Sequence, residues 1–494
     1  MPPPHSHSTP LHDVVIIGAG ASGLCAARHL LTTDPSLSIL LLEALPHVGG
    51  RVHTATLSSP SLQSDIRVDL GAEFIHGSTT LINELVRENG WPTVEVFTAA
   101  QGDGGPDDAP TSDLSMYGVY FLNESKTLLR YDSDDADFVK MNEAFWSLST
   151  LDPADIPSSL SIADHFQQSK ISTRMTGMSN AGYSNTSGCS SLHELSLKRT
   201  VEYERHWKDH DGCCNDDGGD CRLSPPLAMS DVIDHVAADV DVRKNCRTNT
   251  KVLKVDYAED TINIETSSEP GRLVQTKKVV VTVPVRIMID GDIEFNPPLP
   301  AEKIEALSLY GMEDALKLFL VFRTRVWPEK VQNCIIADAP IPEMWFRSTP
   351  ATSDAPSVHI CCCFATAKFA DSLKALKEPD ATTAALKLLA DMFDRTIDLN
   401  RQELLHSHMV CWSDVESVRG GYSFPRVGIT KESVETIAAP LASKVFFAGE
   451  ATHTGAAMTV HAAMETGIRA AEEVLKTLQP TKNLIDTPLK FMHD

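Results

Sequence analysis

The sequence predicts an α/β fold in which a Rossmann-like domain is interleaved with a mixed α+β domain. A strand–helix–strand pattern with a glycine-rich turn occupies residues 13–43. A chain of 494 residues is too long for one compact core, and this length favours two or three domains. A short strand at residues 445–448 runs into Gly449 near the other end of the chain. We therefore expect one domain to be built from distant segments.

The first unit begins with a β-branched apolar run at residues 13–17, continues as a helix over residues 21–31, and returns to a strand at residues 38–43. A β-strand that leads through glycines into a helix is typical of nucleotide binding, because the helix N-terminus offers unpaired N–H groups to phosphates. The pattern predicts that the helix start faces a pyrophosphate.

The turn of this unit has a G-x-G-x-x-G spacing. Gly18 permits the tight turn, Gly20 lets a pyrophosphate approach the backbone, and Gly23 allows the helix to pack closely on the strand. Ser22 lies in the first helical turn, and we expect it to contact the dinucleotide as well. Such a motif alone indicates only a dinucleotide.

The residues that follow the glycine-rich turn indicate which dinucleotide is bound. Glu43 ends the second strand and can accept hydrogen bonds from ribose hydroxyls, with Ala44 beside it; the alternative is a solvated glutamate at a strand end. Gly49 and Gly50 then deliver Arg51, whose guanidinium could pair with the pyrophosphate. At this point the chain resembles the glutathione-reductase-type FAD proteins, so we expect FAD rather than NAD.

Further elements set the expected domain boundaries. Helices are expected at residues 230–239 (with Ser230 as N-cap), 381–392 and 461–475, and strands at residues 251–257, 261–266, 277–283, 317–322 and 445–448. Residues 102–164 are acidic and turn-rich, and residues 177–191 are rich in Ser, Gly and Asn, so both are expected to be loop-rich. The expected division is a disordered start at 1–12, an FAD-binding domain at 13–80, 225–300 and 425–480, a substrate-binding domain at 81–224 and 301–424, and a tail at 481–494.

Charge and composition exclude several classes of partner. The formal net charge of -24 disfavours nucleic acid and anionic membranes, and it could concentrate cationic molecules or simply confer solubility. The first residues contain no apolar signal region, and no run reaches the ~18 apolar residues of a membrane span. We expect a cytoplasmic protein, monomeric or homodimeric. The eleven cysteines fit no zinc spacing, so free thiols are expected, including Cys213, Cys214, Cys221 and residues 361–363, and no metal site.

Segments along nearly the whole chain resemble the flavin-containing amine oxidases, in the order of that family. They are residues 49–51, 69–77, 279–284, 293–300, 316–328 and 446–450. Among the members, polyamine oxidases and the catalytic part of lysine-specific histone demethylases are the most similar, and monoamine oxidases also share the pattern. The resemblance implies non-covalent FAD here, because Gly421 stands where monoamine oxidases carry the cysteine that bonds the flavin.

The resemblance also implies a second flavin-contacting segment near the end of the chain. Gly449 would let the backbone approach FAD, and Glu450 would bind its hydroxyls. Thr459 and Val460 begin the last helix, whose positive end would stabilise charge on the reduced flavin; the alternative is an ordinary surface helix. Val252 is also expected to contact FAD.

Lys317 is the expected catalytic residue. It lies inside an apolar, strand-like run, where an ammonium group is costly to bury. Its position resembles that of the family lysine that holds a water beside flavin N5. The alternative is an outward-facing lysine on a half-exposed strand.

The substrate site is expected to include Tyr422 as an aromatic wall, with Thr459 where monoamine oxidases place the opposite wall. His76 matches the tunnel histidine of animal-type polyamine oxidases, and Glu73 and Glu204 could attract a distal ammonium. A satisfied loop histidine and ordinary surface carboxylates are the alternatives.

These residues predict an FAD-dependent oxidase that moves a hydride from the carbon beside an amine nitrogen to flavin N5, giving an imine and then hydrogen peroxide from O2. A polyamine or another amine without a carboxylate is the expected substrate. An L-amino-acid oxidase would carry a carboxylate-binding arginine shortly after Leu70-Gly71, where this chain has Glu73 and Phe74. A biosynthetic tailoring oxidase or desaturase and a scaffold with a structural flavin are further alternatives. A histone demethylase is disfavoured, because no helical module precedes the first strand and no long heptad pattern occurs.

Overall fold

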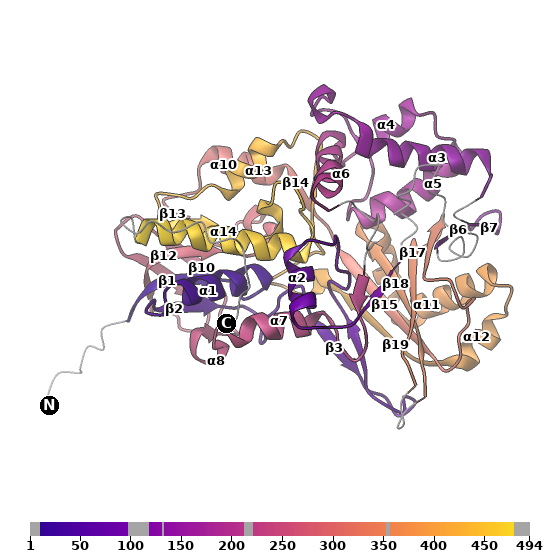
Figure 1. Ribbon diagram of the computed structural model, residues 1–494, viewed down its shortest axis with the longest axis horizontal. Helices are drawn as coiled ribbons and strands as arrows, with labels where there is room; N and C mark the ends of the chain where they lie inside the picture. Colours follow the sequence, from indigo (N-terminus) through magenta and orange to yellow (C-terminus); the bar gives the residue numbers. More distant parts are fainter. Residues whose placement is uncertain (1–9, 97–117, 131–132, 212–220, 352–355, 479–494) are drawn as a thin grey trace. The chain divides into compact units, whose positions relative to one another are not determined.

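The computed structural model describes residues 10–96, 118–130, 133–211, 221–351 and 356–478. The backbone divides into two compact units, coloured along the sequence in Figure 1. The first unit comprises the described parts of residues 1–52, 230–308 and 431–494, and the second comprises those of 53–229 and 309–430. Each unit is thus assembled from separate segments of the chain.

The first unit is built on an eight-stranded sheet with the order β13-β10-β11-β12-β1-β2-β9, in which β21 also pairs with β12. The strands are β1 (Leu11–Ile17), β2 (Ile39–Leu42), β9 (Cys246–Arg247), β10 (Val252–Asp256), β11 (Ile262–Thr266), β12 (Val274–Val281), β13 (Glu294–Asn296) and β21 (Val445–Phe447). β1 runs parallel to β2 and β12, and β12 runs parallel to β21. The residues from Val14 to Ile17 are buried on both faces, as expected for a covered parallel strand.

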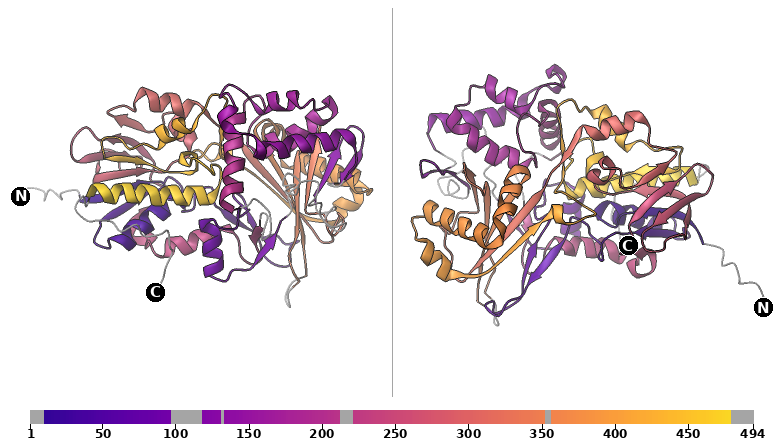
Figure 2. Two further views of the ribbon diagram at one scale, coloured as in Figure 1. Left: turned by 45° about the horizontal axis from the view of Figure 1, so that its top comes forward. Right: turned by 180° about the vertical axis from the view of Figure 1, so that it is seen from behind.

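Two helices from opposite ends of the chain pack together in this unit, α1 (Ala21–Thr33) and α14 (Val460–Leu478). They lie side by side in both views of Figure 2. Gly467 of α14 makes the approach possible, because a Cβ atom there would lie 2.1 Å from the carbonyl oxygen of Ser22. The start and the end of the chain therefore belong to one structural unit. The other helices of this unit are α7 (Met229–Ala238), α8 (Val242–Asn245), α9 (Val285–Ile289), α10 (Ala301–Ser308) and α13 (Lys431–Ala438), followed by the short η6 (Glu450–Thr452).

The second unit is built on a seven-stranded sheet with the order β19-β15-β18-β17-β16-β6-β7. The strands are β6 (Gly118–Leu122), β7 (Thr127–Arg130), β15 (Ala315–Phe322), β16 (Asn333–Ala337), β17 (Glu343–Ser348), β18 (His359–Thr366) and β19 (Leu404–Cys411). Neighbouring strands are antiparallel except β6 and β16, which are parallel. The helix α11 (Ala367–Met392) packs across β15, β18 and β19.

The two faces of this sheet differ in chemistry because side chains alternate along each strand. One face is apolar: Leu316, Leu318, Leu320, Cys361, Cys363 and Met344 join one hydrophobic core cluster with residues of α11. The intervening side chains carry the polar and aromatic groups. Lys317 lies opposite Phe364, and Phe364 lies opposite Glu343, so these three form one row across β15, β18 and β17.

Helices and short strand pairs complete the second unit. The helices are α2 (Leu81–Glu88), α3 (Ala136–Trp146), α4 (Ile162–Gln168), α5 (Thr173–Ser179), the π-helical turn η4 (Asn180–Ser184), α6 (Leu197–Asp211) and α12 (Ile397–Glu403), with 3-10 turns η2 (Ser147–Thr150), η3 (Pro153–Asp155) and η5 (Trp412–Asp414). The strand pairs are β3 (Thr54–Leu57) with β4 (Ile66–Asp69), β5 (Thr93–Glu95) with β8 (Cys221–Leu223), and β14 (Tyr310–Met312) with β20 (Ser423–Pro425).

Most elements expected from the sequence are present, with several corrections. The helix expected at 230–239 begins at Met229, so Ser230 is not its N-cap. The helix expected at 381–392 is the last part of α11, which bends at Lys377 (φ 61°) just before Pro379. Residues 11 and 12 belong to β1 rather than to a disordered start.

Two regions expected to be loop-rich contain regular structure. The described part of residues 102–164 holds β6, β7, α3 and part of α4, and residues 177–191 continue α5 into the π-helical turn η4. One side of this helical segment is buried, and it carries Met175, Met178 and Ala181. A few apolar residues are therefore enough to hold a helix against the core when they lie on the same face. Residues 53–80, which were expected in the FAD-binding domain, lie in the second unit. In that unit Asp69, the last residue of β4, accepts a hydrogen bond from Lys317 of β15.

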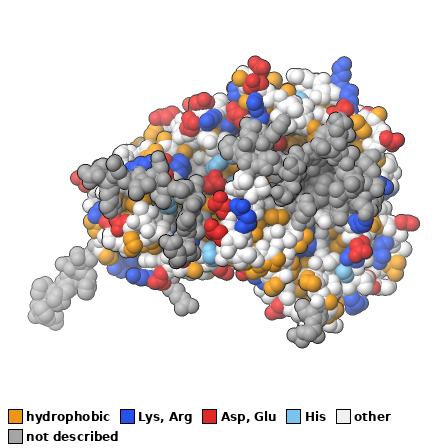
Figure 3. Space-filling view, in the orientation of Figure 1, with side chains coloured by type: hydrophobic (Ala, Val, Ile, Leu, Met, Phe, Trp, Pro, Cys, Tyr) orange, Lys and Arg blue, Asp and Glu red, His pale blue; other side chains and the backbone are white. Residues whose placement is uncertain are grey.

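The nine cysteines among the described residues are all free thiols, and six of the nine are buried in strands or helices. Cys213 and Cys214 lie outside the described residues. On the described part of the face drawn in Figure 3, acidic side chains lie among basic ones. No helix in the described segments is long and apolar enough to cross a lipid bilayer.

Candidate active site and flavin-binding residues

The glycine-rich turn between β1 and α1 has distinct requirements at its three glycines. Gly18 has a φ of +103°, and a Cβ atom there would lie 2.7 Å from Oγ1 of Thr282. A Cβ atom at Gly23 would lie 2.0 Å from the carbonyl oxygen of Gly18. At Gly20, by contrast, the nearest atom is the oxygen of Gly49 at 3.8 Å, so this position leaves room beside the backbone. The protein's own packing requires Gly18 and Gly23, whereas Gly20 keeps space for a ligand.

Ser22 gives an independent indication that an anion belongs at this helix start. Its side chain is buried, and its Oγ has no hydrogen-bond partner among the residues that the structure describes. A buried hydroxyl without a partner costs about 1–3 kcal/mol, so such a group is expected to meet a ligand or water. The hydroxyl donates well to a phosphate oxygen, and the first turn of α1 contains no acidic residue to repel one.

Glu43 lies where the sequence predicts the ribose-binding acid. Its Oε2 accepts a hydrogen bond from the backbone N–H of Ala19 at 2.7 Å, and its Oε1 accepts one from Leu45 at 2.8 Å. Burial raises the pKa of Glu43, while these backbone donors oppose the rise. Each carboxylate oxygen retains a lone pair for a hydroxyl donor. Ala44 directly follows Glu43. The N–H of Thr250 donates to the carbonyl oxygen of Glu43, and the buried Val252, two residues further on, is the first residue of β10.

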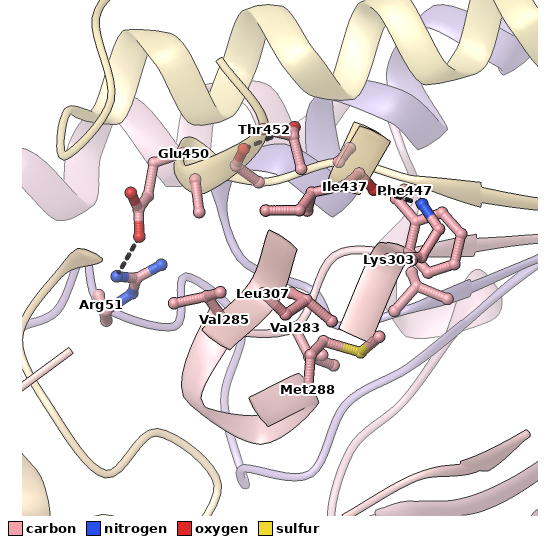
Figure 4. A pocket seen from close by; sticks show the side chains of 14 residues that line it. Arg51, Val283, Val285, Met288, Lys303, Leu307, Ile437, Phe447, Glu450 and Thr452 are labelled. Carbon is pink, nitrogen blue, oxygen red and sulfur yellow. Dashed lines mark hydrogen bonds and ion pairs between the residues drawn. The ribbon is translucent and has the colours of Figure 1, made fainter. Parts of the chain in front are cut away.

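Arg51 and Glu450 join the two distant cofactor segments. Nη1 of Arg51 lies 2.9 Å from Oε1 of the buried Glu450, and the close-up in Figure 4 shows this ion pair at the edge of a recess. Oε2 of Glu450 accepts from the N–H of Met458 at 3.1 Å, just before α14. Gly50, with a φ of +57°, precedes the arginine, and Gly449, with a φ of +126°, precedes the glutamate. The recess contains about 430 Å³ of space not filled by protein atoms, part of which is open solvent, and its other lining residues include Val285, Leu307 and Lys303.

The predicted start of the last helix is confirmed at Thr459 and Val460. α14 begins at Val460, and Oγ1 of Thr459 accepts from the N–H of Ala462 at 3.3 Å. The first turn of α14 contains no acidic residue, so the positive end of the helix is not neutralised there.

Lys317 is buried in β15 rather than facing solvent, which excludes the outward-facing alternative. Its side chain is 4% exposed. Nζ donates to the carbonyl oxygens of Asp69 and Gly71 at 2.9 and 2.8 Å, and to Oε2 of Glu73 at 2.9 Å. The lysine is thereby attached to the turn that follows β4.

Glu73 is a buried anion shared by two cations. Its Oε1 accepts from Nη1 of Arg222 at 2.9 Å while Oε2 binds Lys317. Burial alone would raise the pKa of Glu73, but Lys317, Arg347 and Arg222 outweigh burial and lower it to about 2. Burial raises the pKa of the neighbouring Asp69 to about 6, and the charge of Glu73 adds to this rise.

Aromatic rings surround this ion cluster. The Trp345 ring lies with its centroid 5.1 Å from Nζ of Lys317, in a cation–π arrangement. Trp345 also packs edge-on against Phe74 at 4.6 Å and stacks on Phe364 at 4.6 Å. The polar face of the second sheet therefore presents a lysine and a carboxylate among aromatic rings.

Three other predicted substrate residues, Tyr422, His76 and Glu204, also belong to the second unit, whereas Thr459 belongs to the first. Tyr422 donates its hydroxyl to the carbonyl oxygen of Thr186 at 2.6 Å and packs on Gly188, and burial raises its pKa. The ring of His76 lies 6.4 Å from that of Phe74, and Glu204 accepts from the hydroxyl of Tyr183 at 3.3 Å. Of the predicted substrate residues in this unit, Glu73 is the one that contacts Lys317. The roles of all these residues remain predictions.

Sequence reasoning missed three members of this cluster. Arg222 lies in a short strand after a stretch with no readable pattern, and Trp345 and Glu343 lie in an unremarkable apolar strand. Glu343 is 4% exposed and accepts from Trp345 Nε1 at 2.7 Å, from Asn333 at 2.9 Å and from Asn185 at 3.2 Å. Of these three residues, Glu343 could have been found from the sequence, because it is a charged residue within an apolar run, like Lys317.

The parallel strands β12, β1 and β2, the glycine turn with a serine hydroxyl that has no partner among the described residues, and the acid at the end of β2 define a dinucleotide-binding protein. The chain belongs to the family of flavin-containing amine oxidoreductases, whose family model matches residues 21–475. The predictions of fold class, family and FAD are thereby confirmed. FAD fits the residues present, since Gly20 leaves space, Ser22 offers a donor and Glu43 retains acceptors.

Curated relatives and solved structures support the same family. Lysine-specific histone demethylase 2 of Homo sapiens is 27% identical over 94% of this chain and 53% of its own length. Polyamine oxidase 2 of Arabidopsis thaliana is 26% identical over 93% of this chain and 87% of its length, and the peroxisomal N(1)-acetyl-spermine/spermidine oxidase of Bos taurus is 24% identical over 94% and 95%. The chain thus spans little more than half the length of the histone demethylases it matches.

Among solved structures, wild-type putrescine oxidase bound to putrescine superposes with a TM-score of 0.75 at 18% identity, covering 95% of this chain and all of that one. Cyclohexylamine oxidase from Brevibacterium oxydans IH-35A gives a TM-score of 0.74 at 18% identity, over 95% of this chain and 100% of that one. At this identity the similarity demonstrates the fold alone.

Proposed function

We propose that this chain is an FAD-dependent oxidase of amines that lack a carboxylate, with polyamines as the preferred class. The observation that carries the proposal is the buried Lys317–Glu73 ion pair, set among Trp345, Phe74 and Phe364 on the polar face of the second sheet. Buried charges are rare in such surroundings, and because a buried ion pair contributes little net stability, this one is a candidate for a site of chemistry.

FAD, when bound, would supply the redox chemistry, namely transfer of a hydride from the carbon beside the amine nitrogen and return of the two electrons to dioxygen, which would give hydrogen peroxide. The substrate loses one C–H bond and becomes an imine, which water cleaves to an aldehyde and an amine. The residues of this chain bind and orient. Glu43, Arg51, Glu450 and Ser22 would hold the cofactor, and Lys317 would supply positive charge near the reacting groups.

The residues after Leu70-Gly71 argue against the alternative of an L-amino-acid oxidase. Glu73 and Phe74 stand where that class would carry a carboxylate-binding arginine, and the buried Glu73 is an anion that would repel a substrate carboxylate. Two relatives, a polyamine oxidase and an N(1)-acetyl-spermine/spermidine oxidase, support the polyamine class.

The proposal is tested by mixing the purified holoenzyme without oxygen against a panel of amines and following the loss of the yellow flavin absorbance. The panel contains putrescine, spermidine, N-acetylspermine, benzylamine, L-leucine and a dimethyl-lysine peptide. We expect polyamines to reduce the flavin fastest and to release hydrogen peroxide when air is admitted. Reduction by L-leucine alone would establish the amino-acid oxidase, reduction by the peptide alone a demethylase, and reduction by nothing in the panel would refute amine oxidation.

A further inference from the structure

His453 lies between two parts of the first unit that are predicted to contact FAD. Glu450 precedes it by three residues, and the start of α14 at Thr459 and Val460 follows it. The side chain of His453 is 16% exposed and is paired with a residue of α14. The conformation of the segment between the predicted FAD contacts can therefore depend on this histidine.

Nδ1 of His453 is a hydrogen-bond acceptor. The backbone N–H groups of Gly455 and Ala456 point to it, with N···N distances of 3.0 and 2.8 Å. A backbone N–H can only donate, so Nδ1 presents a lone pair and the ring proton lies on Nε2. Nε2 then donates to Oε2 of Glu465 in α14 at 3.0 Å. The neutral ring uses both nitrogens in a single tautomer.

Further hydrogen bonds connect this turn to the predicted FAD contacts. The carbonyl oxygen of Ala456 accepts from Oγ1 of Thr459 at 2.7 Å, and Thr459 directly precedes α14. The N–H of Met458 donates to Oε2 of Glu450 at 3.1 Å. Met458 has a φ of +73°, a conformation that such a residue adopts only where its surroundings hold it. A change in the turn at His453 would therefore reach both predicted contacts.

Charged groups from two helices face a recess beside His453. The recess contains about 820 Å³ of space not filled by protein atoms, part of which is open solvent, so the ring can exchange protons with water. The charged residues that line it are Glu435 of α13 and Glu465, Arg469 and Glu473 of α14. Glu465 favours a protonated ring, and Arg469 disfavours one. In η6, Glu450 is paired with Arg51.

Protonation of His453 would place a hydrogen on Nδ1, where it would face two N–H groups. Both hydrogen bonds of the turn would be lost, and three donors would meet without an acceptor between them. The ion pair with Glu465 would become stronger, but both of its side chains are partly exposed, and such pairs contribute little stability. The turn is therefore stable with the neutral ring and opens when the ring takes up a proton.

We propose that His453 is a positioning residue for FAD: its neutral ring holds the segment between Glu450 and Thr459 in the conformation that binds the cofactor, and protonation of the ring loosens FAD. Imidazole side chains change charge between about pH 5 and 8, so this effect falls in an accessible range. The inference rests on the predicted FAD contacts of the first unit and goes beyond the proposed amine oxidation. It does not depend on which substrate is oxidised.

The test measures the rate at which the purified holoenzyme releases FAD after dilution, with released flavin quantified in filtrates brought to one common pH. We expect release from the wild type to become about fivefold faster or more between about pH 8 and about pH 5.5. A wild-type rate that does not change over this range would overturn the proposal. No substrate is present, so the result is separate from that of the amine panel.

His453→Asn and His453→Gln separate the roles of the two ring nitrogens. The amide oxygen of asparagine can accept from the same backbone N–H groups as Nδ1, but it does not titrate. We expect His453→Asn to release FAD within about threefold of the wild-type rate at pH 8 and to lose most of the acceleration in acid. Glutamine can reach toward Glu465 but offers the turn no acceptor in the place of Nδ1, so release should be about tenfold faster or more at both pH values. Full acid acceleration in His453→Asn, or wild-type release by His453→Gln, would overturn the proposal.

Glu465→Gln tests the charge beside the ring. It keeps an acceptor for Nε2 and removes the carboxylate that favours the protonated ring, so the acceleration should need a pH lower by about half a unit or more. A merely structural role of His453 would not move this midpoint, and an unchanged midpoint would contradict the proposal.

His12→Asn is the matched control. His12 belongs to the same unit, and its Nδ1 lies 3.1 Å from Oγ of Ser38 rather than in the segment that follows Glu450. We expect this variant to keep the wild-type release rate and pH profile, and loss of the acid acceleration here as well would show that the effect is not specific to His453. Unfolding temperatures identify any variant that does not fold, and His453→Asn, which keeps the turn, then decides the test.

Discussion

Gly467 of α14 lies against the backbone of Ser22 in α1, at a distance that leaves no room for a side-chain atom: a Cβ would sit 2.1 Å from the Ser22 carbonyl oxygen and 2.9 Å from the carbonyl carbon. The obstacle is backbone and cannot rotate away. This contact closes the cofactor-binding unit by joining its first helix to its last.

Gly467→Ala is therefore expected to force α14 away from α1 and to destabilise the fold by about 1–3 kcal/mol, the usual cost of overpacking a core. The measurement is the unfolding temperature together with the rate of FAD release. Gly182→Ala is the control, because its Cβ would meet Ile335 at an ordinary 3.6 Å. An unchanged unfolding temperature for Gly467→Ala would show that the helices are not packed as described.

Ser22→Ala is expected to weaken FAD binding without destabilising the cofactor-free protein. Within the described parts of the chain the Ser22 hydroxyl has no hydrogen-bond partner, so its removal breaks no hydrogen bond there and removes a buried polar group. A lost bond to a charged phosphate oxygen is worth about 1.5–3 kcal/mol, so the affinity for FAD should fall by about tenfold or more. Titration of FAD into the cofactor-free variant measures this. A loss of stability with unchanged affinity would mean that the hydroxyl serves the fold.

Site residues could be predicted from the sequence where their identification depends on neighbouring residues in the chain. The glycine turn, the acid at Glu43 and the charged residue within the apolar strand at Lys317 could be predicted because each rests on neighbours in the chain. The ion pair between Glu73 and Arg222 could not be predicted, since these residues are brought together where Ile75, in the turn after β4, bridges to Cys221 of β8. The same limit explains the helices missed between residues 133 and 191, whose apolar residues are sparse but share a buried side.

Lys303 is a second buried lysine, and its role is structural. Its Nζ donates to the carbonyl oxygens of Thr436, Ile437 and Ala439 at 2.6, 2.8 and 2.9 Å, where α13 ends, and it lies 4.2 Å from the centre of the Phe447 ring. A cation that satisfies the last carbonyls of a helix also interacts favourably with the helix dipole.

Lys303→Met is expected to leave these carbonyls unsatisfied and to lower the stability of the fold by about 2–4 kcal/mol. Thermal unfolding of the variant measures the loss. Lys431→Met, at the exposed start of the same helix, is the control and should stay within about 0.5 kcal/mol of the wild type. A similar small effect at Lys303 would contradict the capping role.

Asp69 gives the stability of this protein a pH dependence of unusual sign. Burial raises the pKa of Asp69 to about 6, above its value of about 3.8 in the unfolded chain. Between these values the folded state binds more protons than the unfolded state, so stability falls as the pH rises from about 4 to about 6. Glu73, with its lowered pKa, acts in the opposite direction, but only below about pH 4.5.

Asp69→Asn should remove this dependence while keeping an acceptor for Thr54 and for the N–H of Met229. We expect the variant to gain stability relative to the wild type as the pH rises from 4.5 to 7, by on the order of 2 kcal/mol, because a buried charge is no longer formed. Urea unfolding of both proteins at these two pH values measures the difference. A constant difference across the range would show that Asp69 does not titrate there, and it would contradict the raised pKa.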